Sequence, residues 1–395
     1  MPAEFLIFGA TLAGVAIFHR KALPIAACGL LAVITYQWAF GSFPAGPGAA
    51  GLASHLAHEW VILANLFLLL VGFALLAAHF EASGLPKLLP HYLPDDWTGA
   101  LALLAIVFIV SGFLDNIAAA LIGGAAAHTL FRGRVTVRYL VAIVAASNAG
   151  GAGSVLGDTT TTMMWIHHVP PIHVLHAYIA SIVAFVIFAP HAARVQQRHA
   201  PIIKDSPRKP RLDWARAGIV ALVIACAVAA NVSANFAAPL VAERFPVIGS
   251  AVAISLAATS AWRRPDWSLL PGAVAGSAFL LCLVALASLM PVRSLPDPSW
   301  QSALVLGFVS AVFDNIPLTA LALKQGYYDW GLLAYAVGFG GSMIWFGSSA
   351  GVAICNMYPE ARSTRRWLGE GWLVALGYAA GFAALLAVLG WNPEP

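Results

Sequence analysis

The chain has 395 residues, of which 60% are hydrophobic and only 10% are charged, and its mean hydropathy is +0.82. Soluble domains carry about 25% charged residues, so this composition excludes an ordinary soluble protein and indicates a helical membrane protein. The formal net charge is +4. Its basic residues lie in short loops between apolar blocks, which is the positive-inside pattern, so no nucleic-acid partner is expected. The four cysteines lie in apolar stretches without metal-ligand spacing.

Ten apolar blocks are predicted to cross the lipid bilayer as helices. In chain order they are residues 3–18, 22–40, 60–80, 139–166, 174–193, 216–235, 247–262, 268–290, 330–358 and 367–391. The first block is followed, not preceded, by basic residues, so we expect a first span and not a cleavable signal peptide. His55 and His58 are expected in the loop before the third block.

Two further blocks, residues 98–130 and 300–325, are too long or too interrupted for one straight helix. Each carries Asp-Asn near its middle. If both are re-entrant hairpins, 18 of the 21 Lys and Arg residues lie in cytoplasmic loops, and only Arg244, Arg293 and Lys324 lie outside them. We therefore predict an all-α polytopic protein of a bacterial-type inner membrane, with ten transmembrane helices, two re-entrant hairpins and both termini in the periplasm.

The two predicted hairpins open from opposite sides, and each precedes a glycine-interrupted span, at residues 139–166 and 330–358. Residues 111–117 match residues 310–316 almost letter for letter. Related halves of opposite orientation are typical of secondary transporters, and their interrupted helices form the binding site. The sequence thus predicts two inverted repeats, residues 1–193 and 216–395, joined by a cytoplasmic linker at 194–215.

Three carboxylates are expected at the depth of the hydrocarbon: Asp115, Asp158 and Asp314. A charge facing lipid there costs on the order of 3 kcal/mol, so such residues usually face a polar cavity. Asp115 and Asp314 have a simpler explanation, because Asp and Asn are favoured helix N-caps. Capping does not explain why the same pair, completed by Asn116 and Asn315, recurs at both hairpin tips. We therefore expect both pairs to be functional.

The run Gly157-Asp158-Thr159-Thr160-Thr161-Thr162 places a carboxylate beside four hydroxyls within a span. The threonines have a packing explanation, since their hydroxyls can bond to carbonyls one turn earlier. A carboxylate, hydroxyls and the carbonyls freed where the helix breaks at Gly150-Gly151 are also the hard oxygen ligands that a small cation prefers. Ser348 occupies the place of Asp158 in the second half.

Neither hairpin tip and neither glycine break contains Lys or Arg. Three acids without a base favour a cation or a proton as the transported species, although helix N-termini can bind an anion without a basic side chain. The candidate Na⁺ ligands are Asp115, Asn116, Asp158 and Thr159, and no cofactor is expected.

These motifs resemble a known family. Asn148–Ala152 and Gly157–Trp165 are similar to the signature of NhaD-type Na⁺/H⁺ antiporters, which belong to the ion transporter superfamily with arsenite exporters and Na⁺-coupled carboxylate carriers. Asp314–Leu318, Gly340–Ser342 and Gly347–Val352 are similar too, and the likeness covers roughly residues 60–360. The resemblance implies transport domains that move against a scaffold in an elevator-type mechanism, commonly in homodimers, with the ion site at the hairpin tips and helix breaks.

We therefore expect a Na⁺/H⁺ antiporter. Asp115 and Asp158 would bind the cation and the proton competitively, and other residues would complete the site: Asn116, Asn148, Gly150, Gly151, Thr159, Thr160, Asp314, Asn315, Gly340, Gly341, Ser342, Ser348 and Ser349. A carboxylate or oxyanion carrier of the same fold is the alternative. A membrane enzyme is disfavoured, because the sequence has neither a Ser–His motif nor a His-x-x-x-His motif.

Overall fold

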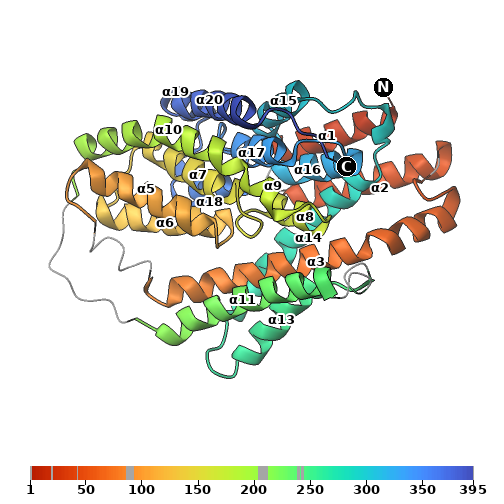
Figure 1. Ribbon diagram of the computed structural model, residues 1–395, viewed down its shortest axis with the longest axis horizontal. Helices are drawn as coiled ribbons and strands as arrows, with labels where there is room; N and C mark the ends of the chain where they lie inside the picture. The colour runs from red at the N-terminus through yellow and green to blue at the C-terminus, as the bar shows by residue number, and fades with distance from the viewer. Residues whose placement is uncertain are drawn as a thin grey trace. The chain divides into compact units, whose positions relative to one another are not determined.

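The computed structural model describes residues 2–18, 21–41, 43–85, 93–202, 212–237, 241 and 244–394. Residues 203–211 of the predicted linker lie outside this described part. Within it the regular secondary structure is helical, apart from two isolated β-bridges (Figure 1). Packing divides the chain into two compact units, Met1–Ser83 with Leu212–Pro296 (unit 1) and Gly84–Arg211 with Asp297–Pro395 (unit 2). Each unit therefore takes a stretch from both halves of the sequence.

Unit 1 consists of long apolar helices. They are α1 (Ala3–Ile17), α2 (Ala22–Phe40), α3 (Gly48–Ala82), α11 (Trp214–Ala237), α13 (Val247–Thr259) and α14 (Leu270–Ser288), with short 3₁₀ turns at Trp267–Leu269 and Val292–Ser294. Helix α3 packs against α11, α13 and α14, and α2 packs against α1 and α14.

The start of α3 differs from the prediction. The sequence placed His55 and His58 in a loop, whereas the helix already begins at Gly48 and contains both. The small apolar residues after Gly48 allow the helix to continue through these polar positions. His55 is buried, and its Nε2 lies 3.0 Å from the hydroxyl of Ser288 on α14. A buried histidine with a hydrogen-bond partner is compatible with a helical core.

Unit 2 contains both predicted hairpins and both predicted broken spans. Its helices are α5 (Trp97–Ser111), α6 (Asn116–Leu130), α7 (Val137–Ala152), α8 (Thr159–Ile166), α9 (Pro171–Leu175), α10 (Ala177–His199), α15 (Trp300–Ser310), α16 (Asn315–Gln325), α17 (Trp330–Gly340), α18 (Ser349–Met357), α19 (Thr364–Glu370) and α20 (Trp372–Leu389). Each predicted hairpin is a pair of helices that turns just before its Asp-Asn. The first break lies at 153–158, a few residues after the predicted Gly150-Gly151.

The core of unit 2 is formed by α7 and α17, whose residues are almost all buried. Each packs against the first helix of its own pair, α7 on α5 and α17 on α15. The second helices cross over, because α6 packs against α18 and α16 packs against α8. Helices α10 and α20 run side by side over this core (Figure 1). The crossed packing brings residues of both sequence halves to one site.

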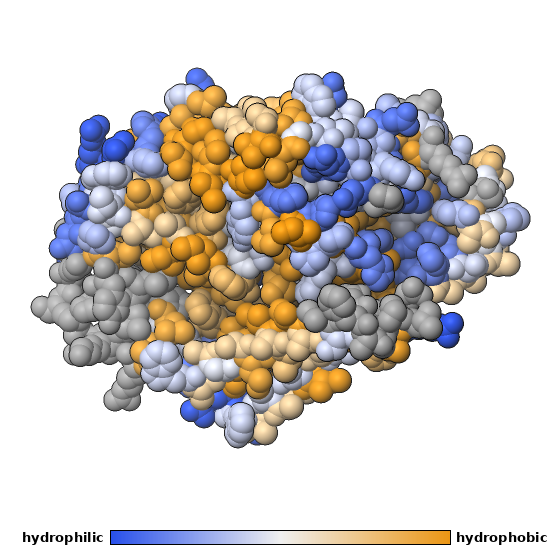
Figure 2. Space-filling view, in the orientation of Figure 1, coloured by the Kyte–Doolittle hydropathy of each residue, from blue (hydrophilic) through white to orange (hydrophobic). Residues whose placement is uncertain are grey.

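Five helices of the described residues are long and apolar enough to cross a membrane: Ala22–Phe40, Gly48–Ala82, Pro171–His199, Trp267–Ser288 and Trp372–Leu389. The other apolar helices are shorter or interrupted, so the arrangement of ten spans and two re-entrant hairpins stays a prediction. Figure 2 shows apolar surface over α10 and α20, where Ile182, Val186, Trp372 and Leu376 are exposed. Exposed large apolar side chains on such helices are expected where lipid is the solvent.

Candidate functional site

Asp158 is the most deeply buried of the three predicted carboxylates, with 2% of its surface exposed. It is the N-cap of α8, and one of its oxygens accepts a hydrogen bond from the backbone N–H of Thr160 at 3.2 Å. The other oxygen accepts from the side-chain amide of Asn315 at 3.3 Å. The first bond is ordinary capping, whereas the second joins the two halves of the sequence.

The acids at the two helix-pair tips serve as caps. Asp115 accepts from the N–H of Ile117 at 3.2 Å, and Asp314 accepts from the N–H of Ile316 at 3.1 Å. Both carboxylates are half-buried. Both acids thus cap their helices, and the hydroxyl of Ser349 also donates to Asp314 at 3.4 Å. Their expected part in ion binding stays a prediction.

The asparagines that follow the capping acids point into the core of unit 2. Asn116 and Asn315 are 5% and 4% exposed. The amide of Asn116 donates to the side-chain oxygen of Asn148 at 3.1 Å. The amide of Asn148 donates in turn to the hydroxyls of Ser342 at 3.0 Å and Ser348 at 3.1 Å. Asn148 is thus the hub of a buried polar network that reaches α6, α7, the second helix break and the cap of α18.

The predicted glycines allow helices to approach each other closely. A Cβ atom on Gly150 would lie 1.9 Å from the carbonyl oxygen of Phe108, and one on Gly340 would lie 2.3 Å from that of Gly307. A Cβ on Gly151 or on Gly341 would lie 2.6 Å from a carbonyl oxygen within its own helix break. The same contacts recur at equivalent positions of the two halves, so these glycines set the shape of both breaks.

The two halves differ at the centre of the site. Ser348 caps α18 as Asp158 caps α8, but it is neutral and accepts from the N–H of Gly351. The position equivalent to Asn148 is Gly338, where a Cβ would lie 3.2 Å from a carboxylate oxygen of Asp158. The contact between Asn148 and Ser348 therefore has its counterpart in the contact between Gly338 and Asp158. Of the three predicted carboxylates, only Asp158 is fully buried.

The four threonines after Asp158 do not form a ring of ligands. The hydroxyls of Thr161 and Thr162 donate back to carbonyls of the break, to Ser154 at 2.5 Å and to Val155 at 2.9 Å. Among the hydrogen bonds of the described residues, none involves the side chain of Thr159, which is half-buried. The hydroxyl oxygen of Thr160 is fully buried and meets no hydrogen-bond partner there. Thr159 and Thr160 are thus the two threonines of the run whose hydroxyls make no hydrogen bond there, and of the two only Thr160 is fully buried.

Tyr178 on α10 is a site residue that sequence reasoning missed. Its hydroxyl donates to the carbonyl oxygen of Gly150 at 3.1 Å, and its ring occupies the space that a side chain at Gly153 would need. The only signal in the sequence is Gly153, the third glycine of the break, and a glycine does not reveal which ring covers it.

The electrostatics of the site are set by acids and helix ends. In α6, α7, α8, α16, α17 and α18, the only Lys or Arg residues are Arg138, at the start of α7, and Lys324, in the last turn of α16. The described residues contain no cluster of three His, Cys, Asp or Glu side chains that could hold a metal ion. A bound cation would therefore rely on one buried carboxylate together with neutral oxygens of hydroxyl, amide and carbonyl groups.

Comparison with known proteins places the chain in a family. A profile of the citrate transporter family CitMHS matches residues 13–340. The chain belongs to this family. The chain is also 26% identical to sodium/proton antiporter 1 of Arabidopsis thaliana, with 98% of this chain and 72% of the relative covered.

Two bacterial relatives are Na⁺/H⁺ antiporters named NhaD. The one from Vibrio parahaemolyticus is 25% identical, with 69% of this chain and 77% of the relative covered. The one from Halomonas elongata is 36% identical over a shorter match, with 23% of this chain and 19% of the relative covered. The resemblance to NhaD-type antiporters and the prediction of a secondary transporter are thus confirmed. The family and these relatives are transporters and not enzymes, and this member is a multi-pass membrane protein.

Proposed function

We propose that this CitMHS family member exchanges Na⁺ for protons, and that Asp158 carries either ion in turn. The observation that carries the proposal is the geometry of Asp158, a fully buried carboxylate whose side-chain partner is a neutral amide. Because no basic side chain of the described residues neutralises it, its charge is balanced only when a cation or a proton is bound. The two ions then compete for one group, which is what obligatory exchange requires.

The neutral groups around Asp158 supply further cation ligands. The hydroxyl of Thr160 is buried without a hydrogen-bond partner among the described residues, and the hydroxyl of Ser342 keeps a free lone pair after accepting from Asn148. In this proposal Asp115, Asp314, Asn116 and Asn315 hold the helix ends that frame the site. The glycines at 150, 151, 340 and 341 keep the helix breaks open.

The helix ends at the site favour a cation over an anion. Helices α6, α8, α16 and α18 begin there, and each N-terminus carries roughly half a positive charge. Three of these N-termini are already capped by a carboxylate, at Asp115, Asp158 and Asp314. Together the three acids outweigh the four helix dipoles, so the site has a net negative charge that an entering cation reduces.

The remaining features of the proposal concern the whole transporter. Unit 2, which contains the site, would move against unit 1 in an elevator-type mechanism. The two sequence halves, 1–193 and 216–395, would be inverted repeats with re-entrant hairpins at 98–130 and 300–325. We further propose a homodimer in a bacterial-type inner membrane with both termini in the periplasm. The recurrence of the same glycine contacts and caps in both halves supports the repeats.

A Na⁺-coupled citrate carrier is the second candidate, because the matching family is described as one of citrate transporters. One structural feature favours it. Helix α18 begins with the neutral cap Ser348, so its N-terminus is the one at the site without its own carboxylate. A substrate carboxylate bound there would be stabilised by the helix dipole.

The deciding experiment is Na⁺-driven proton movement in proteoliposomes that contain Asp158→Asn. This variant keeps the size of the side chain and the capping oxygen but cannot ionise, so we expect exchange to be abolished at unchanged protein level. Asp96→Asn is the matched control, since Asp96 caps the exposed start of α5 and Asn is an equally good cap. Asp96→Asn should exchange at the wild-type rate.

Two results would contradict the antiporter proposal. Exchange by Asp158→Asn at the wild-type rate would remove Asp158 from the ion pathway. If the wild type moves no protons with Na⁺ alone but takes up Na⁺ with citrate, and Asp158→Asn loses that uptake, the protein is a citrate carrier and Asp158 binds its coupling ion.

A further inference from the structure

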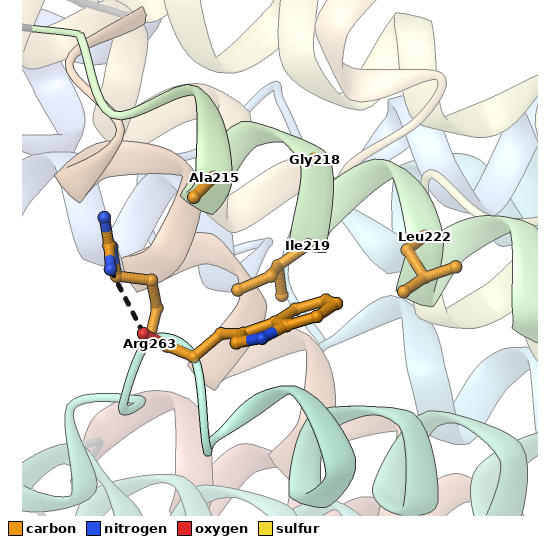
Figure 3. Close-up of a pocket in the computed structure, with 6 residues that line it drawn as sticks. Ala215, Gly218, Ile219, Leu222 and Arg263 are labelled. Atoms are coloured by element: carbon orange, nitrogen blue, oxygen red, sulfur yellow. Dashed lines mark hydrogen bonds between the residues drawn. The ribbon is translucent and has the colours of Figure 1, made fainter.

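Unit 1 contains a cavity that is separate from the candidate transport site. It has a volume of about 390 Å³ and lies between the first half of α11 and the turn after α13. Its lining is Ala215, Gly218, Ile219, Leu222, Trp262 and Arg263. Figure 3 shows Ala215, Ile219 and Leu222 along one face of α11, with Arg263 near the start of that helix. The volume is in the range of small-molecule pockets, roughly 300–1,000 Å³.

The wall of the cavity is apolar and open. Trp262 is 75% exposed and Leu222 is 45% exposed, so two large apolar side chains lack a protein neighbour over much of their surface. A Cβ on Gly218 would meet no atom within 4 Å, which shows that this glycine faces empty space. An apolar surface of this kind is stabilised by covering it with another apolar group.

The end of the cavity near Arg263 is basic. The Arg263 guanidinium donates to Asp213 at 2.9 Å and to the carbonyl of Trp262 at 3.2 Å, which leaves further N–H donors on the guanidinium. Arg216 lies 3.6 Å from the same Asp213 carboxylate, and Arg264 forms no ion pair within the described residues.

One acid, Asp213, lies between Arg216 and Arg263, and a second, Asp266, follows Arg264 by two residues in the chain. The hydrogen bond from Arg263 lowers the pKa of Asp213, so this acid is ionised and offsets one arginine. Asp266 accepts from the N–H and the hydroxyl of Ser268 and caps the next turn. Three arginines against two acids leave an excess of positive charge beside the apolar wall. An amphiphile with an anionic head matches this combination.

We propose that this cavity binds an anionic phospholipid of the bilayer, with an acyl chain against Ile219, Leu222 and Trp262 and its phosphate at Arg263 and Arg264. Trp and Arg at the end of an apolar helix such as α13 are typical of the membrane interface. The positive-inside pattern assigns the Arg263-Arg264 turn to the cytoplasmic leaflet, where anionic lipids and basic pockets meet.

The test is native mass spectrometry of the full-length transporter in detergent. Phosphatidylglycerol and phosphatidylcholine with identical acyl chains are added at equal concentration, and glycerol 3-phosphate is added separately as the head group alone. We expect wild-type protein to retain phosphatidylglycerol about tenfold more than phosphatidylcholine, and to retain no glycerol 3-phosphate. Gly218→Leu should lower phosphatidylglycerol retention about tenfold, because the new side chain fills the cavity without a backbone clash.

Gly276→Leu is the matched control, since a Cβ at Gly276 of α14 also meets nothing within 4 Å but lies outside the cavity lining. It should retain lipid as the wild type does. Arg263→Gln with Arg264→Gln should remove the preference for phosphatidylglycerol, and Asp213 keeps Arg216 as a partner in that variant. The thermal midpoint of each variant confirms folding.

Three results would overturn the proposal. Equal retention of the two lipids by the wild type would show no anionic site. Unchanged phosphatidylglycerol retention in folded Gly218→Leu would place the lipid elsewhere. If Gly218→Leu instead converts a dimer into a monomer without losing lipid, the cavity is covered by a second copy of the chain.

Discussion

Thr160 combines two properties that oppose each other in a folded protein. Its hydroxyl oxygen is fully buried, yet it has no hydrogen-bond partner among the described residues. An unsatisfied buried polar group costs about 1–3 kcal/mol. Its neighbours Thr161 and Thr162 avoid this cost by bonding to carbonyls of the helix break. A group that destabilises the empty protein but lies beside Asp158 is explained if it binds the transported ion.

Thr160→Val removes the hydroxyl and keeps the shape of the side chain. We expect the Na⁺-free protein to be stabilised by about 1 kcal/mol, measured as a higher thermal midpoint in detergent. We also expect the apparent Na⁺ affinity in the exchange assay to fall about tenfold, or ~1.4 kcal/mol, because one neutral ligand is lost. Thr159→Val should change neither quantity. Lower stability with unchanged Na⁺ affinity in Thr160→Val would show that the hydroxyl is structural.

At this scale the sequence indicated polar residues at the helix breaks, but not which of them contact one another. The carboxylate at hydrocarbon depth and its match to Ser348 follow from the aligned motifs, because spacing is visible in one dimension. The choice of Thr160 over Thr159 depends on how α8 is rotated about its axis. The hydrogen bond from Asn148 to Ser348 depends on packing between the two halves, because these residues are 200 positions apart in the chain. Neither is encoded in a local pattern.

At the scale of the element, the site is shaped by helices that touch through glycine. Helix α17 lies so close to α15 that the backbones of Gly340 and Gly307 are in contact, and α7 approaches α5 in the same way at Gly150. Such approaches are typical of helices in membranes, where small residues allow close packing. They also fix the position along each helix at which the break occurs.

Gly340→Ala should therefore destabilise the protein by about 1–3 kcal/mol, because its Cβ would lie 2.3 Å from a backbone oxygen that cannot rotate away. Gly276→Ala makes the same change where a Cβ meets nothing within 4 Å, and it should stabilise the helix by up to about 1 kcal/mol. The measurement is thermal unfolding of both variants in one detergent. Equal midpoints for the two variants would mean that α15 and α17 are free to separate.

The elements themselves were largely predictable, since apolar blocks and Asp-Asn turns mark the helix ends of both pairs. The prediction failed at the start of α3, where His55 was taken as a loop residue. A hydropathy pattern cannot show that a distant serine satisfies a buried histidine, so polar residues near a helix end shorten the predicted helix.

At the scale of the whole molecule, each packing unit draws on both halves of the sequence. The predicted membrane topology is testable at two exposed turns, one on each proposed side. In a background without the four native cysteines, Ser294→Cys should react with a membrane-impermeant thiol reagent in intact spheroplasts. Glu360→Cys, in the loop before Arg362, should react only after lysis, because that loop is proposed to be cytoplasmic.

The opposite labelling of these two positions would invert the proposed orientation. Labelling of both from outside would mean that the chain crosses the membrane an even number of times between them. The second predicted hairpin would then span the membrane instead of being re-entrant. The linker position Ser206 lies outside the described residues, so Glu360 is the better cytoplasmic reporter.

The crossed packing of unit 2 has a consequence for how the chain is made. Asp158 and its partner Asn315 are separated by 157 residues, so at 5–20 residues per second the partner is synthesised roughly 8–30 s after the carboxylate. During that interval the first half stands in the membrane without the partners that the second half gives to the Asn148 amide and to one oxygen of Asp158. The first half of the site is thus inserted into the membrane before the second half is synthesised, and the site is complete only when both have packed together.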